Sequence, residues 1–135
     1  MKINFFVMLT VTFFCGEATA EWSRIGENNR SVAYIDPLIH RSGDTATYWA
    51  MFDYKATQVS PLSGRQYLSE KSQREMDCRA ERERVLFFTW HSGQMGNGAL
   101  VYTSNKPTNW ELTSLPGSYG NAFWQYICHY NNHGT

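Results

Sequence analysis

The sequence has 135 residues and equal numbers of basic and acidic side chains, 12 Lys and Arg against 12 Asp and Glu. This balance disfavours a nucleic-acid-binding protein, which normally carries a basic excess, and it disfavours a disordered acidic segment. Hydrophobic residues make up 42% and aromatic residues 16% of the chain, which is enough for the core of one domain. The low charged fraction of 18% favours a β-rich exported domain.

The N-terminus has the three-part pattern of a secretory signal peptide. Lys2 supplies the positive charge, residues 3–15 form an almost wholly apolar stretch, and Ala18-Thr19-Ala20 offers small residues at a cleavage site. The apolar stretch is shorter than the roughly 20 residues that span a membrane. No second apolar run of that length follows, so we expect no transmembrane segment in the mature chain. We predict a signal peptide over residues 1–20 and a mature domain over residues 21–135.

Cys15 raises the alternative of a lipid-modified N-terminus. Lipoprotein signals place small residues before the modified cysteine, whereas Phe14 directly precedes Cys15 here. We therefore favour cleavage after Ala20, with Glu21 as the first residue of the mature protein, over lipidation at Cys15.

The first half of the mature chain contains two predicted strands. Residues 32–35 are apolar and stop at Asp36-Pro37, because proline cannot continue a strand ladder. Residues 45–54 are rich in Thr, Tyr, Trp and Phe, which favour pleated sheets. A turn with Pro61 and Gly64 follows them.

The charged stretch in the middle of the chain admits two interpretations. Helix propensity is high, but a helix would have only Met76, Cys78 and Ala80 as apolar residues, and their spacing forms no buried stripe. In a strand these three side chains point to the same face, toward a core. The same alternation puts Arg82 and Arg84 on that face, which counts against the strand. We predict two polar strands here.

A hairpin and a helix complete the predicted fold. Residues 85–90 and 99–103 are β-branched and aromatic runs joined by a glycine-rich connection, as in a β-hairpin. Ser118 is a candidate helix N-cap, and the residues after it repeat apolar side chains at helical spacing. That stripe comprises Phe123, Tyr126, Ile127 and Tyr130.

Cleavage of the signal would leave two cysteines, Cys78 and Cys128. An even pair in an exported chain predicts a disulfide, and two buried free thiols are the alternative. The bond would close a loop of about 51 residues and stabilise the domain by about 4 kcal/mol in the chain-entropy model. It would attach the C-terminal helix to the strand that carries Cys78.

The order and spacing of several short motifs resemble the surface-adhesin protein E family of bacterial exported proteins. The matching residues are Trp22, Tyr34-Ile35-Asp36 with Ile39 and Arg41, Trp49, Ser69-Glu70-Lys71, Glu75-Met76-Asp77-Cys78, Met95-Gly96-Asn97-Gly98, Trp110, Pro116-Gly117-Ser118 and Cys128. The resemblance covers essentially the whole mature chain. It implies a Gram-negative source and an α+β fold, a small antiparallel sheet of about six strands with a C-terminal helix held by a disulfide.

The sequence carries no specific catalytic motif. It has no G-x-S-x-G elbow, no H-E-x-x-H and no P-loop, and the adjacent His91 and Ser92 are the nearest approach to a catalytic pair. His129 and His133 are spaced i, i+4, as in a metal or haem site, but the helix should fray before His133. We therefore expect a non-enzymatic protein without a cofactor.

The resemblance implies an adhesin that binds host extracellular-matrix or serum proteins. We expect the contact on the charged strands, because no convergent polar groups mark a cleft, and we expect Trp49 and Trp90 in the core. The candidate contact residues are Arg65, Lys71, Arg74, Arg79, Arg82 and Arg84. The alternative is a soluble periplasmic binding or inhibitor module, with haem as a candidate ligand. The signal peptide allows the periplasm, the outer-membrane surface or secretion.

Overall fold

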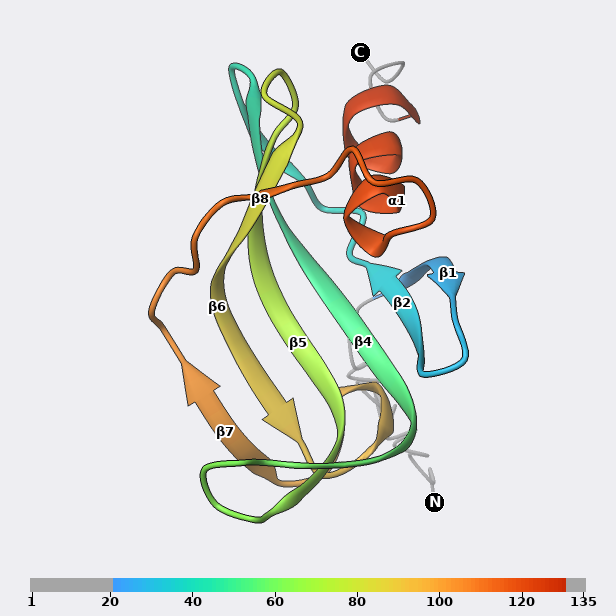
Figure 1. Cartoon of the computed structure of the whole chain (residues 1–135), viewed down its shortest axis with the longest axis vertical. Coiled ribbons are helices and arrows are strands. Elements are labelled where there is room, and N and C mark those ends of the chain that lie inside the picture. Colours follow the sequence, from blue (N-terminus) through green and yellow to red (C-terminus); the bar gives the residue numbers. More distant parts are fainter. Residues whose placement is uncertain (1–20, 131–135) are drawn as a thin grey trace, which may run out of the picture.

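The computed structural model describes residues 21–130, so the predicted signal peptide, Cys15 and His133 lie outside the described residues. The fold is α+β (Figure 1). Its elements are β1 (Ser23–Glu27), β2 (Ser31–Ile35), β3 (His40–Ser42), β4 (Thr45–Val59), β5 (Gln66–Asp77), β6 (Arg82–His91), η1 (Gln94–Gly96), β7 (Leu100–Ser104), β8 (Glu111–Leu112), α1 (Tyr119–Gln125) and η2 (Tyr126–Tyr130). No helix within residues 21–130 is long and apolar enough to cross a membrane.

A single antiparallel sheet dominates the structure. Its main path is β1-β2-β4-β5-β6-β7, while β3 pairs with β4 and β8 pairs with β6. The long strands β4, β5 and β6 lie side by side and bend, so the sheet curls around the side that carries α1 (Figure 1). This confirms the predicted sheet of about six strands with one C-terminal helix. We call the side of the sheet that faces α1 the inner face.

The hydrophobic core lies between α1 and the inner face. Phe123 and Ile127 are both fully buried, which confirms the helical stripe at these two positions. The ring of Phe123 lies 5.6 Å from that of Tyr48 and 6.0 Å from that of Phe52, in tilted and edge-on arrangements that aromatic pairs prefer. The buried cluster is Ala33, Ile35, Ala46, Tyr48, Ala50, Phe52, Met76, Phe123, Ile127 and Cys128.

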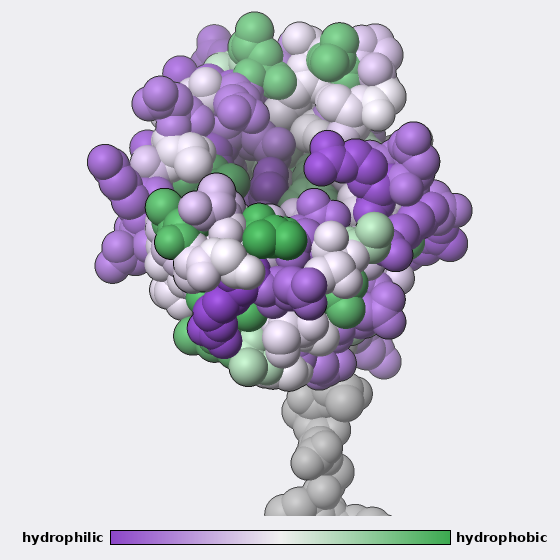
Figure 2. All heavy atoms as spheres, turned by 60° about the horizontal axis from the view of Figure 1, so that its bottom comes forward, coloured by the Kyte–Doolittle hydropathy of each residue, from purple (hydrophilic) through white to green (hydrophobic). Residues whose placement is uncertain are grey.

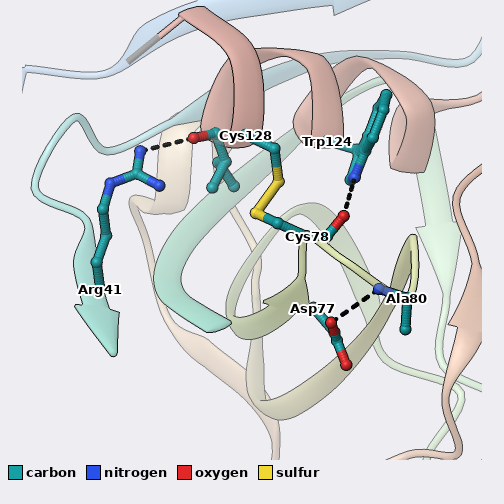
Figure 3. The surroundings of a disulfide bond; sticks show 7 residues. Arg41, Asp77, Cys78, Ala80, Trp124 and Cys128 are labelled. Atoms are coloured by element: carbon teal, nitrogen blue, oxygen red, sulfur yellow. Dashed lines mark hydrogen bonds between the residues drawn. A yellow bond between two sulfur atoms is a disulfide. The ribbon is translucent and has the colours of Figure 1, made fainter. Parts of the chain in front are cut away.

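The C-terminal helix is capped at its start and attached to the sheet at its end. At its start, the side-chain oxygen of Ser118 accepts the backbone N–H of Asn121 at 3.1 Å, which confirms the predicted N-cap. At its end, Cys128 forms the predicted disulfide with Cys78. Figure 3 shows Arg41 beside this bond, where its guanidinium donates to the carbonyl of Ile127 at 2.6 Å. A cation at a helix C-terminus also complements the helix dipole.

The β5–β6 hairpin confirms two polar strands but corrects which of their side chains face the core. Strand β5 ends at Asp77, and residues 78–81 form a turn in which the Asp77 carboxylate accepts the backbone N–H of Ala80 at 3.0 Å. Ala80 is therefore exposed and does not face the core. The turn restarts the alternation, so Glu83 pairs with buried Met76 on the inner face. Arg82 and Arg84 point the other way, which removes the objection to the strand.

The β6–β7 hairpin confirms the predicted glycine-rich connection. Its loop folds back onto the outer face of the sheet, where the Met95 backbone N–H donates to the Asp53 carboxylate at 2.8 Å. Gly96 has a φ of +73° and lies against the side chain of Lys71, so a Cβ at this position would collide with that side chain. The positive φ is the reason why this position favours glycine, because the end of the flexible Lys71 side chain could move away from a Cβ.

Candidate functional site

Three of the six predicted contact residues gather at one end of the β5–β6 hairpin. Arg79 lies in the turn with its side chain 85% exposed, 3.9 Å from the Asp44 carboxylate. The guanidinium carbons of Arg82 and Arg84 each lie 4.5 Å from the centre of the Trp110 ring, which is cation–π distance. We call Arg79, Arg82, Arg84 and Trp110 the hairpin patch.

Acidic neighbours balance the charge of the hairpin patch. Arg82 lies 3.5 Å from the Asp77 carboxylate, and Arg84 lies 3.1 Å from that of Glu75. The side chains of both pairs are partly exposed, so water and salt screen the ion pairs and each contributes about 1 kcal/mol. The arginines are therefore available to exchange these partners for acidic groups of another molecule at little energetic cost.

The other three predicted contact residues lie elsewhere. Arg65 is exposed in the loop before β5, at the end of that strand opposite to the hairpin patch. Lys71 is half-buried beneath the glycine-rich loop. Arg74 points to the inner face, and its side chain is only 13% exposed. The expectation that Arg74 is an accessible basic group is therefore wrong.

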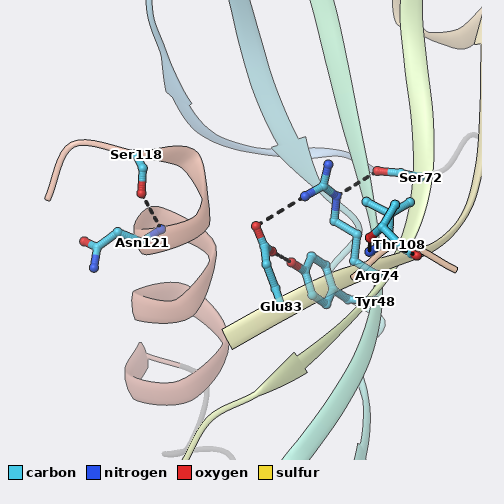
Figure 4. A network of polar contacts seen from close by, with 8 residues as sticks. Tyr48, Ser72, Arg74, Glu83, Thr108, Ser118 and Asn121 are labelled. Carbon is cyan, nitrogen blue, oxygen red and sulfur yellow. Dashed lines mark hydrogen bonds and ion pairs between the residues drawn. The ribbon is translucent and has the colours of Figure 1, made fainter. Parts of the chain in front are cut away.

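Arg74 belongs to a polar network on the inner face (Figure 4). Its guanidinium lies 3.4 Å from one Glu83 carboxylate oxygen and donates to the Ser72 hydroxyl at 2.9 Å. The Tyr48 hydroxyl donates to the other Glu83 oxygen at 2.8 Å. The guanidinium also lies 5.0 Å from the ring centre of Phe52. Buried charges require such compensation, so the network has a structural role.

The inner face also contains a cavity of about 310 Å³, although the sequence predicts no cleft. It opens between the start of α1 and strands β2, β4 and β5. Tyr119 fixes the helix side, because its hydroxyl donates to the Ser31 carbonyl at 2.8 Å. The lining residues are Asn28, Arg30, Ser31, Phe52, Tyr54, Glu70, Arg74 and Tyr119.

Glu70 is the acidic residue that lines this cavity. The Trp90 indole N–H donates to its carboxylate at 2.9 Å. Burial raises the pKa of the Glu70 carboxyl above its ordinary value, and the Trp90 hydrogen bond and the charge of Arg74 oppose that rise. Glu70 thus carries a charge that is expensive to desolvate and has one direct hydrogen-bond partner among the described residues.

A row of aromatic rings continues from the cavity along the inner face. Tyr54 meets Tyr67 edge-on at 5.8 Å, and Tyr67 stacks on Trp90 with ring centres 4.3 Å apart. Trp90 then contacts Tyr102 at 5.1 Å. Trp90 and Trp49 are both half-buried, so neither belongs to the buried core beneath the helix. Burial also raises the pKa values of the Tyr54 and Tyr67 hydroxyls above their ordinary value.

The adjacent His91 and Ser92 have different hydrogen-bond partners. The His91 imidazole bonds to the Thr89 hydroxyl at 2.8 Å, and burial lowers the pKa of this imidazole. The Ser92 hydroxyl accepts the backbone N–H of Ala99 at 2.8 Å, which closes the hairpin loop. Among residues 21–130, no group of three or more His, Cys, Asp or Glu side chains is placed to hold a metal ion.

Solved structures of one protein share this fold. The structure of Haemophilus influenzae protein E matches with a TM-score of 0.63 and 17% identity, over 88% of this chain and 92% of that chain. Crystal form II of the same protein matches with a TM-score of 0.62 and 18% identity, over 83% of this chain and 90% of that chain. Protein E from non-typeable Haemophilus influenzae matches with a TM-score of 0.60 and 16% identity, over 83% of this chain and 78% of that chain. At these identities the likeness concerns the fold alone. No curated protein sequence matches.

The sequence itself matches a known family over nearly all of the described domain. The family model for surface-adhesin protein E covers residues 22–129, from the start of the sheet to the end of the helix. The match includes the disulfide, the hairpin patch and the cavity. The chain therefore belongs to the surface-adhesin protein E family.

Proposed function

We propose that this protein is a non-enzymatic surface adhesin that binds host extracellular-matrix or serum proteins. The observation that carries the proposal is the family match over residues 22–129, together with the shared fold. The similarity of fold alone would not support an adhesin function, because proteins with the same fold have many different functions. An adhesin needs an accessible polar surface, and the sheet and its hairpins present one.

We place the main contact on the hairpin patch. Arg79 is the most exposed arginine of the patch, and Trp110 adds an aromatic surface beside Arg82 and Arg84. Arginine and tryptophan are among the residues most enriched in the energetically important parts of interfaces. The partner would contribute acidic groups, so the contact should weaken as salt rises. Of the six basic residues in the sequence-based hypothesis, Arg65 remains a candidate second contact, while Arg74 serves the interior network.

The test measures binding of the purified domain, residues 21–135, to immobilised matrix and serum proteins over a range of salt concentrations. Arg79→Gln should weaken binding several-fold without lowering the melting temperature, since changes at exposed charges alter stability little. Arg65→Gln makes the same chemical change at the opposite end of β5. If only Arg79→Gln weakens binding, the contact lies on the hairpin patch.

Two other outcomes count against the proposal. If Arg65→Gln weakens binding and Arg79→Gln does not, the contact lies at the opposite end of the sheet. If the domain binds none of the matrix or serum proteins even at low salt, the adhesin function itself is wrong.

A further inference from the structure

The cavity beside α1 combines a half-buried carboxylate with aromatic walls. Glu70 reaches it from β5, and the rings of Phe52, Tyr54 and Tyr119 form its sides. A desolvated carboxylate is stabilised by a cation, and the face of an aromatic ring also attracts one. These two preferences coincide here, which sets the cavity apart from the hairpin patch, where arginines dominate.

Two arginines also line the cavity, and the surroundings of each limit its repulsion of a cation. Arg74 lies nearby, but its charge is paired with Glu83 at 3.4 Å and its guanidinium lies against Phe52. Arg30 lies at the mouth of the cavity and is exposed, so water and salt screen its repulsion of a cation. No ion pair within residues 21–130 engages Glu70, whereas Glu83 has both Arg74 and Tyr48.

We propose that this cavity receives a lysine or arginine side chain of a protein partner, with the cationic group paired to Glu70 and its stem against Tyr54 and Phe52. The volume of about 310 Å³ is large enough to admit a single long side chain. The inference rests on the proposed function, because it identifies the partner as a protein and names the chemistry of one contact.

The rest of the surface formed by residues 21–130 shows no large apolar patch. The exposed large hydrophobic residues are scattered, and Figure 2 shows hydrophobic and hydrophilic atoms intermixed on the face that it presents. Single exposed apolar side chains are normal and do not indicate an interface. They are Leu38, Val59, Leu62, Leu100, Leu112 and Leu115.

The test uses small probes of the side chain, N-acetyl-arginine amide and N-acetyl-lysine amide, with N-acetyl-citrulline amide as the neutral isostere of arginine. Binding is followed by NMR, because the Trp90 indole N–H is bonded to Glu70 and its resonance reports on that carboxylate. Both cationic probes should shift this resonance in a saturable way, and citrulline should not.

Three substitutions then distinguish a cation site from an anion or sugar site. Glu70→Gln should weaken probe binding by about tenfold or more while keeping an acceptor for Trp90, and thermal unfolding checks that the fold persists. Glu81→Gln is the matched control, since Glu81 is exposed in the β5–β6 turn. Arg30→Gln should strengthen binding, because it removes a repelling cation from the mouth. An anionic or sugar ligand site predicts the opposite sign for Arg30→Gln.

The inference and the proposed function fail in different ways. If the cationic probes do not bind, or citrulline binds equally well, or Arg30→Gln weakens binding, the cation site is wrong even where matrix proteins still bind. If the probes bind through Glu70 but no matrix or serum protein binds the domain, the site stands and the adhesin function is wrong.

Discussion

Removing the disulfide tests how the C-terminal helix is held. The double variant Cys78→Ser/Cys128→Ser opens a covalent loop between residues 50 apart in the sequence. For a loop of about 51 residues the chain-entropy model gives a loss of about 4 kcal/mol, compared with a total stability of about 5–15 kcal/mol for a typical domain. The helix keeps the burial of Phe123 and Ile127 and the hydrogen bond from Arg41. We therefore expect a folded but much less stable domain.

Equilibrium urea unfolding measures this loss through the midpoint and the slope. The double variant and the reduced wild-type protein should agree, since both lack the bond and keep the same other contacts. A loss below about 1 kcal/mol would refute the loop-entropy argument. Two free thiols in the native, non-reduced protein would refute the bond itself.

Three further predictions concern the inner face and the N-terminus. Because burial raises the pKa of Glu70 above its ordinary 4.5, the contribution of Glu70 to stability should fall as pH rises from 4.5 to the raised pKa. The free energy of unfolding of the wild type relative to Glu70→Gln should therefore fall between pH 4 and 7, and an unchanged difference would contradict this. Tyr48→Phe removes a donor to buried Glu83 and should cost about 1.5–3 kcal/mol in urea unfolding, and an unchanged midpoint would contradict this. Mass spectrometry of the exported protein should show Glu21 as its N-terminus, and a lipid on Cys15 would overturn that prediction.

Local sequence signals were sufficient for most of the fold. β-Branched and aromatic runs predicted the strands around Tyr48 and Phe88, and Ser118 marked the start of the helix. The sequence did not show that the strand ends at Asp77, because Cys78 and Ala80 continue its apolar alternation. That ending depends on a side-chain hydrogen bond to the turn, which alternation does not encode.

The candidate site was harder to predict, because its residues come together only through the curl of the sheet. Arg74 and Glu83 looked like exposed charges in a polar stretch, yet both lie on the inner face. Arg74 lies two residues before buried Met76 on β5, and Glu83 lies opposite Met76 because the turn restarts the alternation. Glu70 and Trp90 are directly opposite each other on β5 and β6. Their pairing required the hairpin register, which depends on the four-residue turn at 78–81 and on the register shift between Gln73 and Arg74.

The position of the disulfide also governs what a protease can release from this protein. The segment from Asn105 to Ser118 is largely exposed and lies between the two cysteines, so a cut there leaves two pieces joined by the bond. Such a nicked molecule would migrate as an intact chain until it is reduced. Surface-shaving experiments on whole cells should therefore compare reduced with non-reduced samples, or a cleaved and accessible protein will be scored as a protected one.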